Sequence, residues 1–410
     1  MSIRTDADCI ISSVIRDAMP DEAVEKALRG FARPKGRLVL VSIGKAGWQM
    51  AKAAVDILGD AIDDGIVITK YGHAKESLGK IDIYEAGHPV PDSNSFLATE
   101  KAMSKVESLG SDDMVLFLIS GGGSALFEKP LVKEEVLENI TKQLLSCGAD
   151  IVEMNTIRKR LSAVKGGRFA QLCAPAKVFS IVLSDIIGDP LDMIASGPAY
   201  PDSSTCSDAI EIVSRYGLSI DEDVKTLLMT ETPKALDNVE TMVTGSVREL
   251  CISASKACME LGYKPFILTS SLQCIAREAG SFLSSIAEFH QDSKESLAFI
   301  AGGETVVHLT GKGKGGRNQE IALSAAEGIA GLKDVVVFSL GSDGTDGPTD
   351  AAGGIVDGNT KKVLADRGIS IVDVLADNDA YNALAECDGL LMTGPTGTNV
   401  NDVSVILIRR

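Results

Sequence analysis

Two basic side chains stand beside glycines, where a loop can present them to an anion. Lys45 lies in the run Gly44-Lys45-Ala46-Gly47, and Arg317 lies in the basic glycine loop of residues 311–320. At the mouth of a helix either side chain can bind a phosphate or a carboxylate, and arginine can do so through two parallel N–H bonds. The first run is not a Walker A loop, because Val39 stands where that motif needs its first glycine. A lysine lying along the surface and a mobile loop are the structural alternatives.

Three glycines between two serines form a second candidate for anion binding. The residues are Ser120, Gly121, Gly122, Gly123 and Ser124, and such a loop folds tightly enough to turn backbone N–H groups toward a phosphate. Leu126 occupies the third glycine position of the dinucleotide fingerprint, so the usual mode of NAD binding is not predicted. A plain tight turn is the competing interpretation.

Four aspartates follow two further apolar stretches. Asp185 and Asp189 lie in LSDIIGDP, and Asp343 and Asp346 lie in GSDGTDGPTD. Carboxylates at such positions can hold Mg²⁺ or accept a proton from an attacking hydroxyl. The spacing does not match a calcium-binding EF-hand, and a single aspartate in a glycine-rich turn is ordinary turn chemistry. Four of them after two strands favour a function.

The densest basic stretch covers residues 154–168, MNTIRKRLSAVKGGR. On a helix Arg158 shares a face with Leu161, whereas Lys159 does not, so the five cations cannot all serve one site. The pattern favours a solvated basic face. His88, in GHPVPD, is given a structural role, and the chain has neither a zinc-protease motif nor a nucleophile elbow.

Strands of a parallel sheet must position these loops. Uninterrupted apolar strands alternate with helices, which is typical of a parallel sheet covered on both faces; the strongest are residues 38–43, 114–119, 177–183 and 335–340. Residues 6–30 are predicted to form one amphipathic helix, and residues 297–301 and 305–309 a hairpin. Residues 203–240 are polar and helical, and we interpret them as a connection between two α/β domains.

Composition limits the partners of the chain. A length of 410 residues favours two domains, and 45% hydrophobic with 24% charged residues is typical of a folded protein. The net charge of −17 disfavours nucleic acid and anionic membranes, so an anionic substrate needs a locally basic site. The eight cysteines have no metal-binding spacing, and no apolar run approaches the ~20 residues of a membrane span. We expect a cytoplasmic enzyme.

Ten segments together resemble, in order, the class II glycerate kinases, whose C-terminal part is called the MOFRL domain. They are SIGKAGWQMA, GHPVPD, LISGGGSAL, MNTIRKRLSAVKGGR, VLSDIIGD, ASGPAYPD, GGETVV, GGRNQE, SDGTDGPTDAAGG and TGPTGTNVND. The resemblance implies an α/β fold with a Rossmann-like N-terminal domain at residues 1–238 and a smaller α/β MOFRL domain at residues 239–410. It places the active site in the cleft between them.

The same resemblance implies phosphorylation of D-glycerate by ATP with Mg²⁺ or another divalent cation, giving 2-phosphoglycerate and ADP. It makes Lys45 and Arg317 an active-site pair, to which we add Asp185 and Asp189 as catalytic carboxylates and Asp343 and Asp346 as metal ligands. The residues expected to bind substrate or nucleotide are Ser120, Gly121, Gly122, Gly123, Ser124, Asn155, Arg160, Lys165, Glu304 and Asn318. Alternatives are an NAD(P)H-dependent hydroxypyruvate reductase, a non-catalytic anion-binding protein, and phosphorylation at the 3-hydroxyl. A homodimer is left open.

Overall fold

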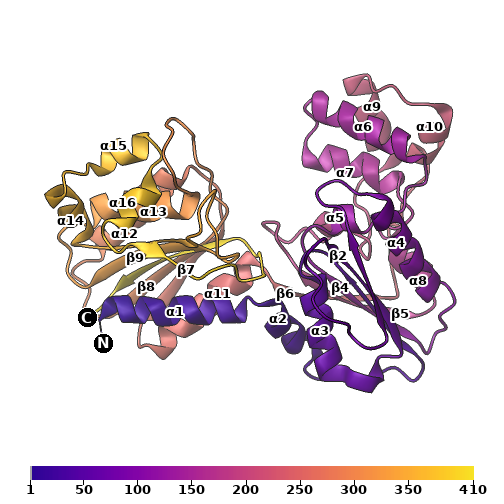
Figure 1. Cartoon of the computed structure of the whole chain (residues 1–410), viewed down its shortest axis with the longest axis horizontal. Coiled ribbons are helices and arrows are strands. Elements are labelled where there is room, and N and C mark those ends of the chain that lie inside the picture. Colours follow the sequence, from indigo (N-terminus) through magenta and orange to yellow (C-terminus); the bar gives the residue numbers. More distant parts are fainter. Residues whose placement is uncertain (1) are drawn as a thin grey trace. The chain divides into compact units, whose positions relative to one another are not determined.

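The computed structural model describes residues 2–410, which form two compact units (Figure 1). The N-terminal unit consists of Ala23–Ser184 and Asp189–Thr244, and the C-terminal unit consists of the residues up to Glu22, Asp185–Gly188 and Gly245–Arg410. The expected division after residue 238 differs from this one, since the beginning of the chain and a short central segment belong to the C-terminal unit. Each unit is described by itself.

A six-stranded sheet forms the centre of the N-terminal unit. Its strands are β1 (Leu38–Ile43), β2 (Asp64–Lys70), β3 (Ile81–Ala86), β4 (Met114–Ile119), β5 (Lys177–Leu183) and β6 (Val239–Gly245). The order is β3-β2-β1-β4-β5-β6, and the pairs from β3 to β5 are parallel. The order reverses between β1 and β4, whose last residues Ile43 and Ile119 are paired. In open α/β sheets ligands bind beyond the strand ends at such a point.

Helices cover both faces of this sheet, which explains why its central strands are apolar throughout. On one face α2 (Pro20–Leu28) and α3 (Gly47–Leu58) pack on Leu38 and Leu40. On the other, Phe117 of β4 contacts Phe127 and also Phe169 of α8 (Arg168–Cys173), with ring centroids 5.9 and 4.9 Å away. α4 (Ser93–Val106) contacts β2, β3 and α8. Short helical turns are η1 (Gly59–Ala61), α5 (Gly123–Leu126) and η2 (Ile194–Ser196).

Four further helices of the N-terminal unit share a core of their own (Figure 1). They are α6 (Glu134–Ser146), α7 (Ile151–Arg160), α9 (Cys206–Tyr216) and α10 (Glu222–Leu228). Capping boxes begin α7 at Asp150 and α9 at Thr205. Residues 203–240 therefore do not form a connection between domains, as the sequence suggested; α9 and α10 pack on α6 and α7 instead.

The C-terminal unit contains a second, mixed sheet. Its strands are β7 (Lys264–Leu272), β8 (Leu297–Gly303), β9 (Val335–Gly341), β10 (Gly353–Asp357), β11 (Leu390–Leu391) and β12 (Asp402–Ile408). The order is β11-β10-β9-β12-β8-β7, and only β7 and β8 are parallel. The predicted hairpin at 297–309 is wrong, because β8 pairs with the last strand of the chain, whereas residues 305–309 form no strand.

Helices also cover both faces of the second sheet. α1 (Ile3–Asp17) and α11 (Val247–Glu260) lie on one face, and α12 (Ala276–Phe289) and α13 (Arg317–Gly328) lie on the other. The latter face also carries α14 (Thr360–Asp366), α15 (Ile371–Ala376) and α16 (Ala380–Ala385). The single helix predicted for residues 6–30 is wrong. The first helix ends at Asp17 and a second begins at Pro20, because proline is not tolerated inside a helix but is accepted at its first turn. The predicted α/β class, with a parallel N-terminal sheet, is confirmed. Among the described residues no helix is long and apolar enough to cross a membrane.

Candidate active site

The loops after β1 and β4 are hydrogen-bonded to each other at the point where the strand order reverses. Lys45 donates its backbone N–H to the carbonyl of Gly121 at 2.9 Å, and Ala46 donates to the hydroxyl of Ser120 at 3.1 Å. Gly44 has a φ of +108°, and a Cβ there would lie 2.2 Å from the Ser120 Oγ. Only glycine fits this close approach. The two glycine-rich runs are therefore one composite loop.

The Lys45 ammonium is the free cation of this composite loop. The backbone carbonyl of Lys45 accepts a hydrogen bond from the Thr69 hydroxyl and lies 2.9 Å from His73 Nδ1, and these contacts fix the main chain. Its side chain is exposed, and within residues 2–410 the ammonium makes no hydrogen bond or ion pair. Its Cγ lies 3.1 Å from where a Cβ on Gly122 would stand. An unpaired cation beside the β4 glycines is available to an anionic ligand.

His88 borders the same loop, which the sequence did not indicate. Its ring lies 3.1 Å from the Cβ position of Gly122. Burial first, and then the positive charges of Lys45 and Lys70, lower the pKa of His88 below its ordinary value. The imidazole is therefore neutral at pH 7, and it adds no positive charge to the loop. The sequence had given His88 a structural role only.

A second turn braces the glycine loop from behind. Ala195, Ser196 and Gly197 all have left-handed backbones, with φ of 51°, 60° and 65°. The Ser196 hydroxyl lies 2.9 Å from that of Ser124 and donates to the side-chain oxygen of Asn155 at 3.0 Å. Strained backbones of this kind persist where surrounding contacts enforce them, often at functional sites. Asn155, expected to bind ligand, is buried and positions Ser196.

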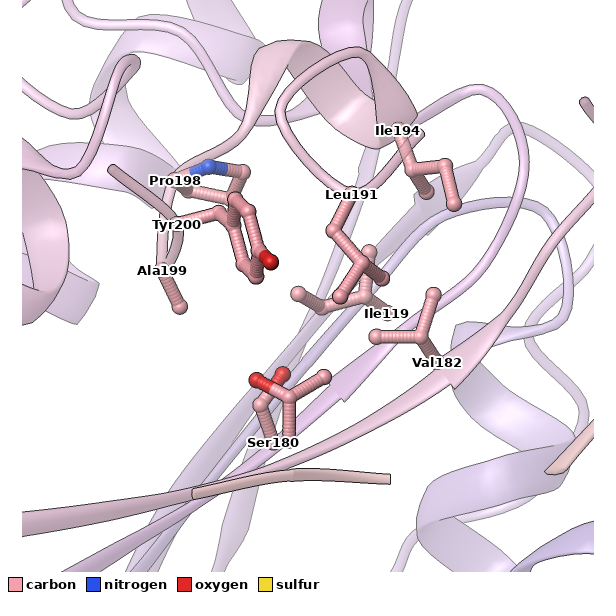
Figure 2. A pocket seen from close by; sticks show the side chains of 9 residues that line it. Ile119, Ser180, Val182, Leu191, Ile194, Pro198, Ala199 and Tyr200 are labelled. Carbon is pink, nitrogen blue, oxygen red and sulfur yellow. The ribbon is translucent and has the colours of Figure 1, made fainter. Parts of the chain in front are cut away.

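A small cavity lies beneath this turn (Figure 2). The side chains of Ile119, Val182, Ile194 and Tyr200 line it, and its volume is about 10 Å³. That space holds one water molecule at most. The cavity is therefore a packing gap at the ends of β4 and β5 and cannot admit a nucleotide or a sugar acid.

The basic stretch at 154–168 is mostly buried, so the predicted solvated face is wrong. Arg160 is fully buried, hydrogen-bonds to Ser204 at 2.9 Å and lies 3.5 Å from the Asp202 carboxylate. Lys165 is also fully buried and pairs with the carboxylate of Glu128. Burial lowers the pKa of Lys165 to about 8, against the opposing charge of Glu128. The expected ligand role of Arg160 and Lys165 is corrected to internal ion pairing.

One cation of this stretch behaves differently. Arg158 is half-buried, and in the described part of the chain it has no hydrogen bond or ion pair. Its charge acts on Lys165 and lowers the pKa of that lysine. Arg158 is thus the member of the basic stretch that remains available to an anion.

In the C-terminal unit Arg317 begins α13 and is held by two carboxylates. Its Nε and Nη2 donate to the two oxygens of Asp402 at 2.5 and 3.1 Å, and its Nη1 donates to Glu304 at 3.1 Å. Burial lowers the pKa of Arg317, but the hydrogen bond and charge of Asp402 outweigh it and the pKa is raised. A guanidinium has five N–H groups, so two remain for a ligand. Glu304 therefore orients Arg317, and Asp402 is a residue that the sequence analysis missed.

Asp346 caps the same helix and does not have the surroundings of a metal ligand. Its oxygens accept the backbone N–H groups of Asn318 and Gln319 at 3.2 and 2.9 Å, and the side chain is buried. Burial raises the pKa of Asp346 to about 7. Asn318, expected to bind ligand, is buried and hydrogen-bonded to Asp346 and Ser339.

The predicted metal pair does not form a cation site by itself. Asp343 accepts the backbone N–H of Thr345 at 3.0 Å through one oxygen, whereas both oxygens of Asp346 serve the helix. Among residues 2–410 no three acidic, histidine or cysteine side chains are grouped as metal ligands. The donors present do not fit a prebuilt divalent-cation site.

The two other predicted carboxylates belong to different units. Asp185 is part of the C-terminal unit, where its carbonyl accepts the Asn401 amide at 3.1 Å. Asp189 is part of the N-terminal unit and has a left-handed φ of 50°. No hydrogen bond or ion pair to the Asp189 carboxylate occurs in the described structure, so this group is available for chemistry.

Comparison with known proteins gives matches along most of the chain. Residues 6–229 match a model described as a domain of unknown function, DUF4147, and residues 297–402 match the MOFRL family. The D-glycerate 2-kinase of Thermotoga maritima is 51% identical over 408 residues, covering 97% of both proteins. The glycerate 2-kinase of Pyrococcus horikoshii is 42% identical over 391 residues, covering 91% of this chain and 88% of the relative.

Two relatives, both from Agrobacterium vitis, have a different name and are provisionally named hydroxypyruvate reductases. One of them is 40% identical over 416 residues, covering 97% of this chain and 93% of the relative. The crystal structure of the Thermotoga maritima glycerate kinase superposes with a TM-score of 0.94 at 50% identity, covering 98% of this chain and 99% of that one. The chain therefore belongs to the family of glycerate kinases built from a DUF4147 part and a MOFRL part.

Proposed function

We propose that the protein transfers the terminal phosphate of ATP to D-glycerate at the 2-hydroxyl, giving 2-phosphoglycerate and ADP in the cytoplasm. The observation that carries this proposal is the unpaired Lys45 ammonium beside the Ser120–Ser124 loop, at the reversal of strand order. The names of the relatives from Thermotoga maritima and Pyrococcus horikoshii support glycerate as the acceptor.

Phosphoryl transfer needs positioning and charge neutralisation more than covalent chemistry from the protein. Lys45 supplies a mobile positive charge that is not already neutralised by a carboxylate. The Ser124 hydroxyl donates its only proton to Ser196, whose own proton goes to Asn155, and it therefore positions the loop. The backbone N–H groups at the start of α5 supply donors for phosphate oxygens. These groups are proposed to bind phosphate rather than glycerate.

Arg317 is proposed as the second residue that donates hydrogen bonds to an anionic group of the substrates. Asp402 and Glu304 fix its orientation through three N–H groups. Its remaining N–H groups can donate to a carboxylate or a phosphoryl oxygen without losing conformational freedom on binding. The carboxylates of Asp185 and Asp189 remain the proposed acceptors of the glycerate hydroxyl proton.

Mg²⁺ is proposed to enter with ATP. This cation usually keeps several waters and is held by substrate phosphates with one or two carboxylates, so it does not need a cage of protein ligands. When bound, it supplies positive charge to the phosphates. Neither Asp343 nor Asp346 is assigned to it.

A coupled assay tests the proposal. The protein is incubated with ATP, Mg²⁺ and D-glycerate, and ADP is followed; enolase without a mutase is then added, because only 2-phosphoglycerate is its direct substrate. ADP formation with enolase turnover is expected. ADP without enolase turnover would indicate the 3-hydroxyl. No ADP, together with NAD(P)H oxidation on hydroxypyruvate, would replace the kinase by a reductase.

A further inference from the structure

Three basic residues follow neighbouring strands of the N-terminal sheet, at the edge that carries the Ser120–Ser124 loop. His88 comes two residues after β3, Lys70 is the last residue of β2, and Lys45 comes two residues after β1. The three strands are adjacent and parallel, so their carboxyl ends lie at one edge of the sheet. The order continues to β4, which runs into the loop. Lys70 and His88 have no role in the chemistry proposed above.

Strand alternation places the Lys70 side chain on the face of the sheet that carries the Ser120–Ser124 loop. Val67 belongs to the core that α3 covers, so Ile68 and Lys70 point to the opposite face. Ile68 is paired with Ile43 of β1, and the Ile43 Cδ1 lies 3.3 Å from where a Cβ on Gly123 would stand. α5, which begins at Gly123, also contacts β2 (Figure 1). Lys70 therefore extends the strand that lies against the loop.

The cations of this edge are not neutralised within the protein. In the described part of the chain, neither Lys45 nor Lys70 makes a hydrogen bond or ion pair through its ammonium, and the ring of His88 makes none either. Asp92, which follows His88 closely, caps α4 and accepts the Tyr71 hydroxyl at 2.7 Å. The chain has 57 acidic residues against 40 basic ones. Two unpaired ammoniums at one edge of such a protein favour an anionic ligand there.

The positive charges of the two lysines act together on His88. After burial, which is the largest cause, the charges of Lys45 and Lys70 lower the pKa of the imidazole, and His73 adds to this effect. The ring also lies 3.1 Å from the Cβ position of Gly122, at the middle of the loop. An anion bound among these groups offsets their mutual repulsion and favours the protonated imidazole. Anion binding and proton uptake by His88 are therefore linked.

We propose that Lys70 and His88 bind a phosphate group of the substrates together with Lys45. We call these three residues the phosphate cluster. The inference rests on the proposed function, in which the Ser120–Ser124 loop receives phosphate. Hydrogen bonds between an ammonium and a phosphate are about twice as strong as neutral ones, so Lys70 contributes affinity for the ligand. His88 donates one hydrogen bond as a neutral imidazole and adds a positive charge when it is protonated.

Calorimetric titration of the full chain with ADP tests the contribution of Lys70. Lys70→Met is expected to raise the dissociation constant about 10-fold or more, and Lys70→Arg is expected to restore most of the affinity. The urea midpoint of Lys70→Met without ADP is expected to equal that of the wild type, because no internal ion pair is lost. Lys177→Met is the matched control, since Lys177 is exposed at the opposite end of a strand of the same sheet.

The same titrations with 2-phosphoglycerate and with D-glycerate identify the group that is bound. A loss of affinity for ADP assigns the phosphate cluster to the nucleotide, and a loss for 2-phosphoglycerate assigns it to the phosphate of the product; either result supports the proposal. A loss confined to D-glycerate means that a carboxylate binds there, and unchanged affinity for all three ligands removes Lys70 from the site. Both results overturn the proposal.

Nuclear magnetic resonance of the histidine rings tests the cluster without turnover. The chain has four histidines, so the His88 signal is the one that His88→Asn removes. Its pKa is expected to rise when ADP binds, and to rise in Lys70→Met without ligand because one positive charge is removed. The signal of His308, which is exposed, is expected not to shift.

An unchanged His88 pKa in both experiments would place Lys70 and the ligand away from this ring and overturn the proposal. Failure of the proposed function appears differently, as the absence of ADP formation in the coupled assay, whatever these binding measurements show.

Discussion

The basic residues of this chain have different roles, which depend on whether a carboxylate of the protein pairs with them. Lys165 is buried against Glu128, and Arg160 is buried near Asp202, so both contribute to the fold. Removing one member of such a buried pair leaves an uncompensated charge and is costly. Lys45 has no such partner, and Arg317 has partners that leave two donors free. The cations available to a ligand are those whose N–H groups are not all used in ion pairs within the protein.

Replacing Lys45 tests this distinction directly. We expect Lys45→Met to lower turnover about 100-fold or more, as for loss of a charge that stabilises a transition state. The urea midpoint is expected to stay the same, because the ammonium has no intramolecular partner to lose. Lys80→Met, at another exposed lysine, is the control. Near-wild-type turnover of Lys45→Met would remove Lys45 from the mechanism.

The Asp346 carboxyl predicts a pH dependence of stability. Its pKa is raised by burial from 3.8 to about 7, so between these values the folded protein holds a proton that the unfolded chain has released. The free energy of unfolding therefore falls as pH rises from about 4 to about 7, by up to about 4 kcal/mol. Urea titrations at several pH values should show that Asp346→Asn lacks this fall.

Asp350 provides a control of opposite sign. A hydrogen bond from Tyr381 at 2.8 Å lowers the pKa of the Asp350 carboxyl. Its contribution to stability is therefore present at neutral pH and is lost as pH falls through the lowered pKa.

For the Asp346 prediction, equal profiles of unfolding free energy against pH for wild type and Asp346→Asn would show that Asp346 titrates normally.

At the scale of elements, the ends of β1 and β4 depend on close backbone packing. The loops touch at Gly44 and Ser120, and the left-handed turn at Ala195 presses on Gly123, where a Cβ would stand 2.7 Å from the Ala195 Cβ. Such contacts leave no room for side chains and hold the loop rigid. The composite loop is thus positioned by two strands and one strained turn rather than by its own sequence.

Gly44→Ala measures this packing. Its Cβ would meet Ser120 at 2.2 Å, whereas a Cβ at Gly72, which also has a positive φ of +77°, meets nothing within 4 Å. Both alanine variants suffer backbone strain, so their difference isolates the steric clash. We expect Gly44→Ala to lose about 2 kcal/mol more stability than Gly72→Ala in urea unfolding. Equal losses would mean that the loops separate easily.

At the scale of the whole molecule, the first helix of the chain, α1, is part of the core of the C-terminal unit. α1 packs on α11 and the second sheet, and the buried Asp6 accepts a hydrogen bond from Tyr263 at 2.7 Å. The beginning and the end of the chain therefore fold together, and cutting the chain at a single linker would remove α1 from its core.

Ile10→Ala tests this cooperation. Ile10 is fully buried in the core that α1 shares with α11, and such a truncation costs about 2–4 kcal/mol. Hydrogen exchange is expected to accelerate in α11 and β9 and to stay unchanged in β1–β5. Ile57→Ala, on the exposed side of α3, is the control. Faster exchange confined to β1–β5 would assign α1 to the N-terminal unit instead.

The sequence by itself determined the most apolar strands, the glycine-rich runs and the family. Apolar runs such as residues 38–43 and 114–119 identify buried strands because both their faces need cover. Ten motifs in one order point to glycerate kinases, which the relatives confirm. Lys45 and Arg317 could be proposed from the sequence because a cation beside glycines is a local pattern, and their role in the reaction stays a prediction.

The tertiary structure decided which of these side chains remain available to a ligand. The burial of Arg160 and Lys165 depends on Asp202 and Glu128, 42 and 37 residues away in sequence, and no local pattern encodes such a pairing. The pairing of β8 with β12 likewise joins strands far apart in sequence, and the packing of α1 on the C-terminal unit brings together the beginning and the end of the chain. Sequence periodicity reports which face of an element is apolar, but only packing determines what covers it.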